Sequence, residues 1–136
     1  MDARAFFHYI VKPNYDEFVR SPNDIRLLWN ALVSMNTVAE YLALERLGYP
    51  QVGRKVIYLE AQKIRRLSGL AELKFCAETF KHVRKIKDRS SDEFTTIATS
   101  TGVSPEDQGT WRIDAYDPVE VIHKAFATLK EIPELK

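Results

Sequence analysis

The chain has 136 residues, the size of one domain that can bury a continuous apolar core without metals or disulfides, and its net charge of +1 points to no particular partner. Its 45% hydrophobic and 29% charged residues, with five glycines and six prolines, exclude a disordered or fibrous protein. The single cysteine, Cys76, excludes an intrachain disulfide and a cysteine-based zinc site, and no apolar run approaches the roughly 20 residues of a membrane span. We therefore expect a cytoplasmic protein with no membrane association.

The N-terminal half is predicted to form a short helix and then a long one. Asp2 can cap a helix over 3–11, which Pro13 is expected to end because proline disfavours helical geometry in the residue before it. The run Ser21-Pro22-Asn23-Asp24 is a helix start signal, and the second helix extends from there to about Leu47. One apolar face of this helix is formed by Ile25, Leu28, Leu32, Met35, Ala39 and Leu42. Further apolar residues widen this surface, so the helix is expected to be central.

Three polar residues interrupt the apolar surface of the long helix: Asn30, Ser34 and Asn36. Buried side chains of this type require hydrogen-bond partners. We interpret them as satisfied polar residues of the core or its boundary. The alternative is a role in helix register or in the seam of a dimer.

Two further helices are predicted in the middle of the chain. The segment 55–66 has apolar residues at helical spacing, and Ser68 and Gly69 then break or bend the chain. The segment 70–87 is amphipathic, with one apolar face and lysines on the other. Its buried face is expected to contain Leu73, Cys76, Phe80 and Val83.

The last part of the chain changes character after Arg89. Residues 94–101 are rich in threonine and β-branched side chains, and 111–116 alternate apolar with polar residues, which predicts the two strands of a hairpin. Asp117-Pro118 then starts a final helix. We therefore predict a mainly α fold in one domain, 1–136: a bundle of four or five helices with its core in 1–88, a small antiparallel β-hairpin in 94–116 and a C-terminal helix in 117–133.

Charge is unevenly distributed along the chain. The segment 54–89 contains eleven basic and four acidic residues, a net +7, so the remainder carries −6. Candidate residues for contact with nucleic-acid phosphates are Lys74, Lys81, Arg84, Lys85 and Lys87. Closely spaced cations release counterions from a nucleic-acid backbone, but they are equally typical of a solvated helix end.

His82 is the first candidate for acid-base chemistry. It follows Glu78 by four positions on the helix predicted over 70–87, where the two side chains can meet and the carboxylate can set the protonation state of the imidazole. The alternative is an ordinary surface pair. His8, His82 and His123 lack metal-ligand spacing, and no glycine-rich phosphate loop occurs. The sequence predicts no metal site and no cofactor.

The start signal at 21–26, the long helix after it and the later Phe80-Lys81-His82-Val83 together resemble small bacterial proteins of the HEPN-like type. The resemblance covers about 21–88. It implies a helical bundle that is often dimeric, and many active members are ribonucleases whose histidine would correspond to His82. The arginine of their motif has no counterpart here, since positions 75–78 are Phe, Cys, Ala and Glu.

These observations predict a non-catalytic interaction or regulatory module. It would assemble as a homodimer through an apolar helical face, or bind a protein partner, and contact RNA or another anionic partner through the basic segment 54–89. The alternative is a metal-independent, HEPN-like endoribonuclease in which His82, helped by Glu78 and a nearby cation, acts as general acid or base.

Overall fold

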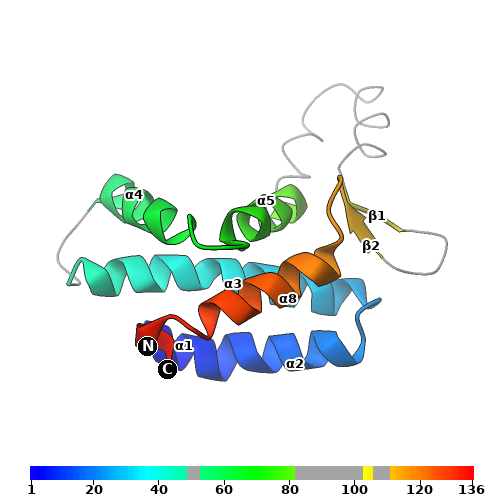
Figure 1. The fold of residues 1–136 in the computed structure, drawn as a ribbon, viewed down its shortest axis with the longest axis horizontal. Helices are drawn as coiled ribbons and strands as arrows, with labels where there is room; N and C mark the ends of the chain where they lie inside the picture. The colour runs from blue at the N-terminus through cyan, green and yellow to red at the C-terminus, as the bar shows by residue number, and fades with distance from the viewer. Residues whose placement is uncertain (49–52, 82–102, 106–110) are drawn as a thin grey trace.

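The computed structural model describes residues 1–48, 53–81, 103–105 and 111–136, with the backbone alone at Lys81 and 103–105 (Figure 1). The fold is mainly helical, as predicted. The predicted strand over 94–101 and most of the predicted end of the 70–87 helix lie outside the described residues. Within the described residues, no helix is both long enough and apolar enough to cross a membrane.

The N-terminal segment is helical through Pro13, so the prediction that this proline ends the first helix is wrong. Helix α1 (Ala3–Phe6) continues through a π-helical segment, η1 (Phe7–Val11), into α2 (Lys12–Arg20). The amide of Lys12 donates to the carbonyl of Phe7, one residue further back than in an α-helix. A proline ring clashes with the carbonyl four residues earlier and lacks an N–H, and the wider π turn accommodates both defects without ending the helix.

Helix α3 (Ile25–Arg46) is the central element, as its sequence predicts. It begins where the Asp24 carboxylate accepts hydrogen bonds from the amides of Arg26 and Leu27, at 2.9 and 3.3 Å. It contacts α1, η1, α2, α4, α5 and α8. Two of its polar residues are buried and hydrogen-bonded, which confirms the interpretation of Ser34 and Asn36 as satisfied polar residues.

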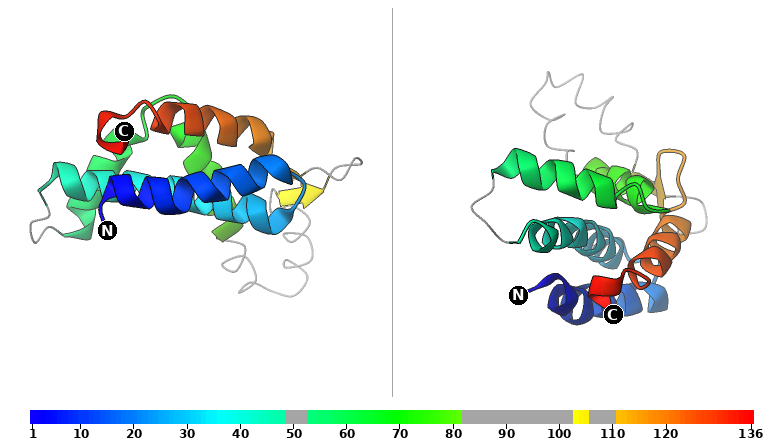
Figure 2. Two further views of the ribbon diagram at one scale, coloured as in Figure 1. Left: turned by 90° about the horizontal axis from the view of Figure 1, so that it is seen from below. Right: turned by 60° about the vertical axis from the view of Figure 1, so that its left-hand side comes forward.

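Helices α4 (Arg54–Ile64) and α5 (Leu70–Lys81) form a layer on one side of α3, and α1 and α2 lie on its other side (Figures 1 and 2). The break between α4 and α5 lies where the sequence predicts it. Gly69 has a φ of +85°, a conformation that favours glycine. The side chain of Thr128 secures this turn by donating to the carbonyl of Ser68 at 2.6 Å.

The C-terminal segment contains a pair of short strands and the last helix. Strand β1 (Val103–Pro105) pairs antiparallel with β2 (Trp111–Ile113), with Val103 opposite Ile113. The predicted hairpin over 94–116 is not confirmed in that form, because β2 has three residues and the predicted first strand is not among the described residues. Helix α8 (Pro118–Leu129) is capped by Asp117 and followed by a turn and the 3₁₀ segment η2 (Pro133–Leu135), so it ends before the predicted residue 133.

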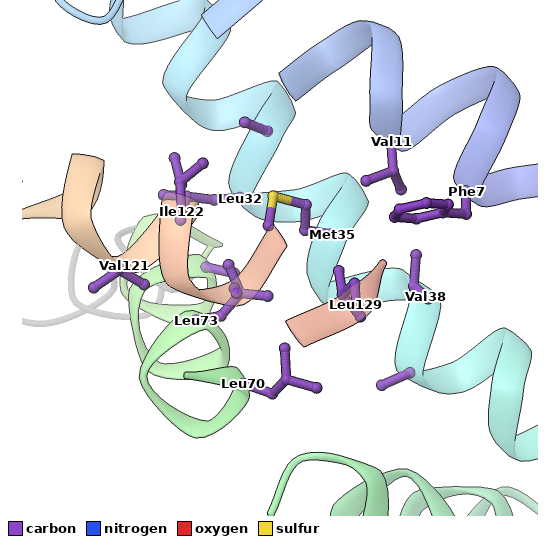
Figure 3. Close-up of a cluster of buried hydrophobic side chains, with 14 of the residues drawn as sticks. Phe7, Val11, Leu32, Met35, Val38, Leu70, Leu73, Val121, Ile122 and Leu129 are labelled. Atoms are coloured by element: carbon purple, nitrogen blue, oxygen red, sulfur yellow. The ribbon is translucent and has the colours of Figure 1, made fainter. Parts of the chain in front are cut away.

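The core lies where α3 meets the helices around it. Figure 3 shows Phe7 and Val11 from the N-terminal helix, Leu32, Met35 and Val38 from α3, Leu70 and Leu73 from α5, and Val121, Ile122 and Leu129 from α8. All ten are buried. Helix α8 therefore joins the two layers on either side of α3, and η2 brings the C-terminus beside α1 (Figure 1). The shared core therefore fixes the positions of α4 and α5, whose outer surfaces contain the candidate site.

Candidate nucleic-acid interface on α4 and α5

The structure describes only part of the predicted site. The side chains of Glu78 and Lys74 are described on α5, and Lys81 ends this helix with its backbone alone. The remaining candidates lie outside the described residues: His82, Arg84, Lys85 and Lys87. The pairing of Glu78 with His82 and the phosphate contacts after residue 81 stay predictions.

Lys74 is held between α4 and α5 and is not a freely solvated cation. Its ammonium lies 5.2 Å from the centre of the Tyr58 ring and 3.7 Å from a carboxylate oxygen of Glu78, and its side chain is only 20% exposed. The sequence places Lys74 on the face of its helix opposite the buried one, and in the structure its side chain there is partly covered. Its charge contacts the aromatic face of Tyr58 on α4, an arrangement typical of long basic side chains.

The surface of α4 and the turn after it is basic. Four cations are exposed there: Arg54, Lys55, Lys63 and Arg66. Only Lys63 has an ion-pair partner among the described residues, Glu60 at 3.3 Å, and that pair lies on the side of the helix toward α8. Lys55 and Arg66 are therefore exposed cations for which the described part of the chain supplies no ion-pair partner.

Two aromatic side chains are exposed on the layer formed by α4 and α5. Tyr58 is 52% exposed on α4 and Phe75 is 43% exposed on α5, and the ring of Phe75 lies 5.5 Å from that of Tyr116, just after β2. We name Arg54, Lys55, Tyr58, Arg66, Lys74 and Phe75 the basic aromatic surface. Sequence reasoning missed Tyr58 because helical spacing alone does not show that it faces Lys74 across the layer.

Arg65 is the buried cation of this layer, and the sequence does not single it out. Its side chain is 7% exposed, and its guanidinium donates to Asn36 Oδ1 at 3.2 Å, to the Asn36 carbonyl at 3.3 Å and to Gln62 Oε1 at 3.2 Å. The nearest carboxylate is that of Glu40, at 4.0 Å. Burial lowers the pKa of Arg65, and the negative charge of Glu40 opposes that effect. An arginine nevertheless stays protonated near neutral pH.

A cavity of about 400 Å³ lies between α3 and α4, beside Arg65. It is lined by Glu40, Leu44, Arg54, Ile57, Tyr58, Ala61 and Arg65. Two of these residues also belong to the basic aromatic surface, so the cavity opens beside it. The cavity walls are apolar, with cations contributed by α4 and the following turn and one carboxylate from α3, a composition suited to an anionic group.

A larger cleft of about 830 Å³ lies on the other side of α4, against α8. Most of its charged lining is already paired within the chain. Arg46 binds Glu134 at 2.7 Å, Lys63 binds Glu60, and Glu131 lies 3.6 Å from Lys136. This cleft therefore presents less unpaired charge to a ligand than the cavity at Arg65.

The other titratable candidates serve the fold. His8 Nε2 donates to the carbonyl of Leu135 at 2.9 Å, and His123 Nδ1 lies 2.7 Å from the hydroxyl of Tyr15. These two contacts tie the N-terminal helices to η2 and α8. Within the described residues, no three potential metal ligands converge.

Comparison with protein-family models, curated proteins and solved structures returns no match to this chain. The resemblance to HEPN-like proteins therefore stays a prediction. The features of the chain that bear most directly on its function are the basic aromatic surface and the cavity beside it.

Proposed function

We propose that this chain is a non-catalytic helical module that contacts single-stranded RNA through the basic aromatic surface. The observation that carries the proposal is the exposure of Tyr58 and Phe75 on the layer that also exposes Arg54, Lys55 and Arg66, cations with no ion-pair partner among the described residues. A protein partner recognised by charge alone would not require exposed rings at these positions. Single-stranded nucleic acids, in contrast, bind surfaces that combine cations for the backbone with aromatic rings for the bases.

The two kinds of side chain have separate roles in the proposal. Lys55 and Arg66 neutralise phosphates, so binding weakens as salt competes for the strand. Tyr58 and Phe75 stack on bases, which is tolerant of sequence because every base has a π face. In sequence the basic segment continues into 82–89, where Arg84, Lys85 and Lys87 would contact further phosphates of the RNA backbone.

The charge contribution is tested by the double substitution Lys55→Glu and Arg66→Glu. Fluorescence anisotropy with a labelled single-stranded RNA measures the affinity as a function of salt. We expect weaker binding at low salt and a slope of log affinity against log salt that is shallower by about 1.4, or roughly 0.7 for each lost contact. The matched control is Lys12→Glu with Arg20→Glu, which changes the same charge on exposed residues of α2. Equal losses in both double variants would reject the location of the site.

The aromatic contribution is tested by Tyr58→Ala and Phe75→Ala. We expect each substitution to weaken RNA binding by about tenfold, in the range of one lost stacking interaction. Tyr9→Ala is the control, because Tyr9 is also exposed but lies on η1, across α3 from α4 and α5. Unchanged affinity in both test variants would leave a purely electrostatic surface and contradict the stacking role.

The same RNA preparation separates this proposal from the endoribonuclease. Cleavage of RNA by the wild type that disappears in His82→Ala, with the circular dichroism spectrum unchanged, would establish the enzyme instead. Binding without cleavage supports the module.

We also propose that the module assembles as a homodimer. Val56 is 45% exposed on α4, and Leu67, in the turn after α4, is 42% exposed and lines the cleft against α8. Sedimentation equilibrium of the wild type and of Val56→Asp tests this proposal. A dimer that dissociates in the variant supports it, and a wild-type monomer at micromolar concentration rejects it.

A further inference from the structure

We propose that the cavity between α3 and α4 binds the phosphate monoester of a nucleotide, either at the end of an RNA strand or on a free mononucleotide, with Arg65 as its direct ligand. Binding of a strand end rests on the proposed function, and it would fix where the RNA strand ends on the basic aromatic surface. The mononucleotide case does not depend on it.

Within the described residues, Arg65 is a buried cation whose charge partners, Glu40 and Glu78, are not buried; the side chain of Glu78 is 44% exposed. Its three hydrogen-bond acceptors are neutral amide oxygens of Asn36 and Gln62. The Glu40 oxygen at 4.0 Å is beyond hydrogen-bond distance, and the side chain of Glu40 is 60% exposed. A buried charge is costly unless it is paired, so an anion that enters this cavity is favoured.

The guanidinium also has the donors that such an anion needs. Arginine carries five N–H groups, and the amide oxygens accept from its Nε, Nη1 and Nη2 atoms. One N–H on each terminal nitrogen remains for a further acceptor. Two neighbouring N–H groups match two oxygens of one phosphate, which is the bidentate geometry that arginine provides and lysine does not.

The lining of the cavity contains two cations, Arg54 and Arg65, and one carboxylate, that of Glu40. The Glu40 side chain is 60% exposed, and once it has turned into water the two cations match a phosphate monoester, which carries about −1.5 to −2 near pH 7, better than a diester, which carries one negative charge. The volume of about 400 Å³ is suited to one nucleotide end, with the apolar walls of Leu44 and Ile57 against the sugar. The Tyr58 ring at the edge of the cavity is then available to the attached base.

Glu40 competes with the phosphate for Arg65. Because most of its side chain is exposed, the carboxylate can turn into water when an anion enters. Removing its charge should therefore strengthen phosphate binding, whereas a purely structural role of Arg65 predicts no gain. Glu40→Gln is thus a test that does not require the loss of a buried residue.

The experiment compares three forms of one short single-stranded RNA: with a 5′-phosphate, with a 3′-phosphate and with hydroxyls at both ends. Titration calorimetry measures each, together with uridine 5′-monophosphate as the mononucleotide. We expect the wild type to bind at least one phosphorylated strand about tenfold more tightly than the hydroxyl form, as for one strong charge-assisted contact. Glu40→Gln should widen this preference, and Glu17→Gln on α2, which removes the same charge far from the cavity, should leave it unchanged.

Arg65→Lys should remove most of the preference, because lysine keeps the charge but lacks the planar fork. Its thermal unfolding curve shows whether the fold is retained, and Glu40→Gln decides the question if it is not. Equal affinity of the wild type for all three strands, with no binding of the mononucleotide, would overturn the phosphate site and leave the RNA surface standing. Mononucleotide binding that is enhanced in Glu40→Gln, without binding of any strand, would support the phosphate site and reject the proposed function.

Discussion

Burial of Cys76 controls the reactivity of its thiol. Its side chain is fully buried on α5, and burial raises the pKa of the thiol to about 12, assisted by the negative charges of Asp114 and Glu72. Since the thiolate is the reactive species, Cys76 is expected to be inert in the folded protein. Its role is to pack in the core.

Thiol titration tests this expectation. In the native protein at pH 8, an aromatic disulfide reagent should label Cys76 no faster than the chain unfolds, and labelling should become rapid in denaturant. The free energy of unfolding should also fall as pH rises above about 8.5, because the thiol of the unfolded chain ionises while the folded one stays protonated. Rapid labelling under native conditions would show that Cys76 is accessible.

The ion pair between Arg46 and Glu134 is expected to make a pH-dependent contribution to the stability of the fold. The hydrogen bond from Arg46 lowers the pKa of Glu134 in the folded protein. The unfolded carboxyl has a pKa of about 4.3, so the pair stabilises the fold fully above that pH. The stabilisation is lost as pH falls through the lower pKa of the folded protein. Both side chains are about one-third exposed. Solvent screening therefore limits the contribution to about 1 kcal/mol or less.

Glu134→Gln should accordingly be slightly less stable than the wild type at pH 7, and this deficit should be smaller at pH 3. Urea unfolding at the two pH values measures the difference. A larger deficit at pH 3 than at pH 7 would contradict the sign of this argument.

At the scale of single elements, the turn between α4 and α5 depends on Gly69. A Cβ atom there would lie 3.0 Å from Lys124 Cγ and 3.3 Å from the backbone nitrogen of Ala125, and its φ is positive. Gly69→Ala should therefore destabilise the protein by about 1–2 kcal/mol through strain and the contact with α8.

Gly53→Ser is the matched control. Position 53 is the N-cap of α4, has ordinary extended dihedrals and has open space around its Cα. A serine oxygen can accept from the first amides of the helix, so this variant should be neutral or more stable by up to about 1 kcal/mol. Thermal unfolding of both variants measures the contrast, and equal stability of the two would argue against strain at Gly69.

Elements whose signals are local could be predicted from the sequence. The caps of α3 and α8 are encoded by Asp24, two residues after Pro22, and by Asp117, directly before Pro118, and both helices begin where these residues predict. The N-terminal helix could not be predicted in this way, because the π turn that absorbs Pro13 is a response of the backbone and not a pattern of residue types. Packing against α3 then retains the continuous helix.

The site was less predictable, because it depends on contacts between helices. Arg65 is buried through Asn36, 29 positions earlier in another helix, and no local pattern distinguishes it from the exposed Arg66. The sequence places Lys74 opposite the buried face of its helix, but the Tyr58 ring of α4 partly covers it. The sequence shows that the segment 54–89 is basic. Which of its cations are exposed and which are buried depends on how α4 packs on α3.

At the scale of the whole molecule, α3 separates two faces of different character (Figure 2). The face of α4 and α5 carries exposed cations and exposed rings, and the face of α1 and α2 mixes Asp16 and Glu17 with Lys12 and Arg20. The two faces share one core, so a change that unfolds the chain would abolish both. A measurement that reports each face separately in the intact protein is therefore needed.

The most direct measurement is a titration of ¹⁵N-labelled protein with an unlabelled single-stranded RNA, followed by amide chemical shifts. The account predicts that the shifts concentrate in α4 and α5, including Lys55, Tyr58 and Phe75, and that the amides of α1 and α2 do not move. Absence of shifts at saturating RNA, or shifts centred on α1 and α2, would contradict it.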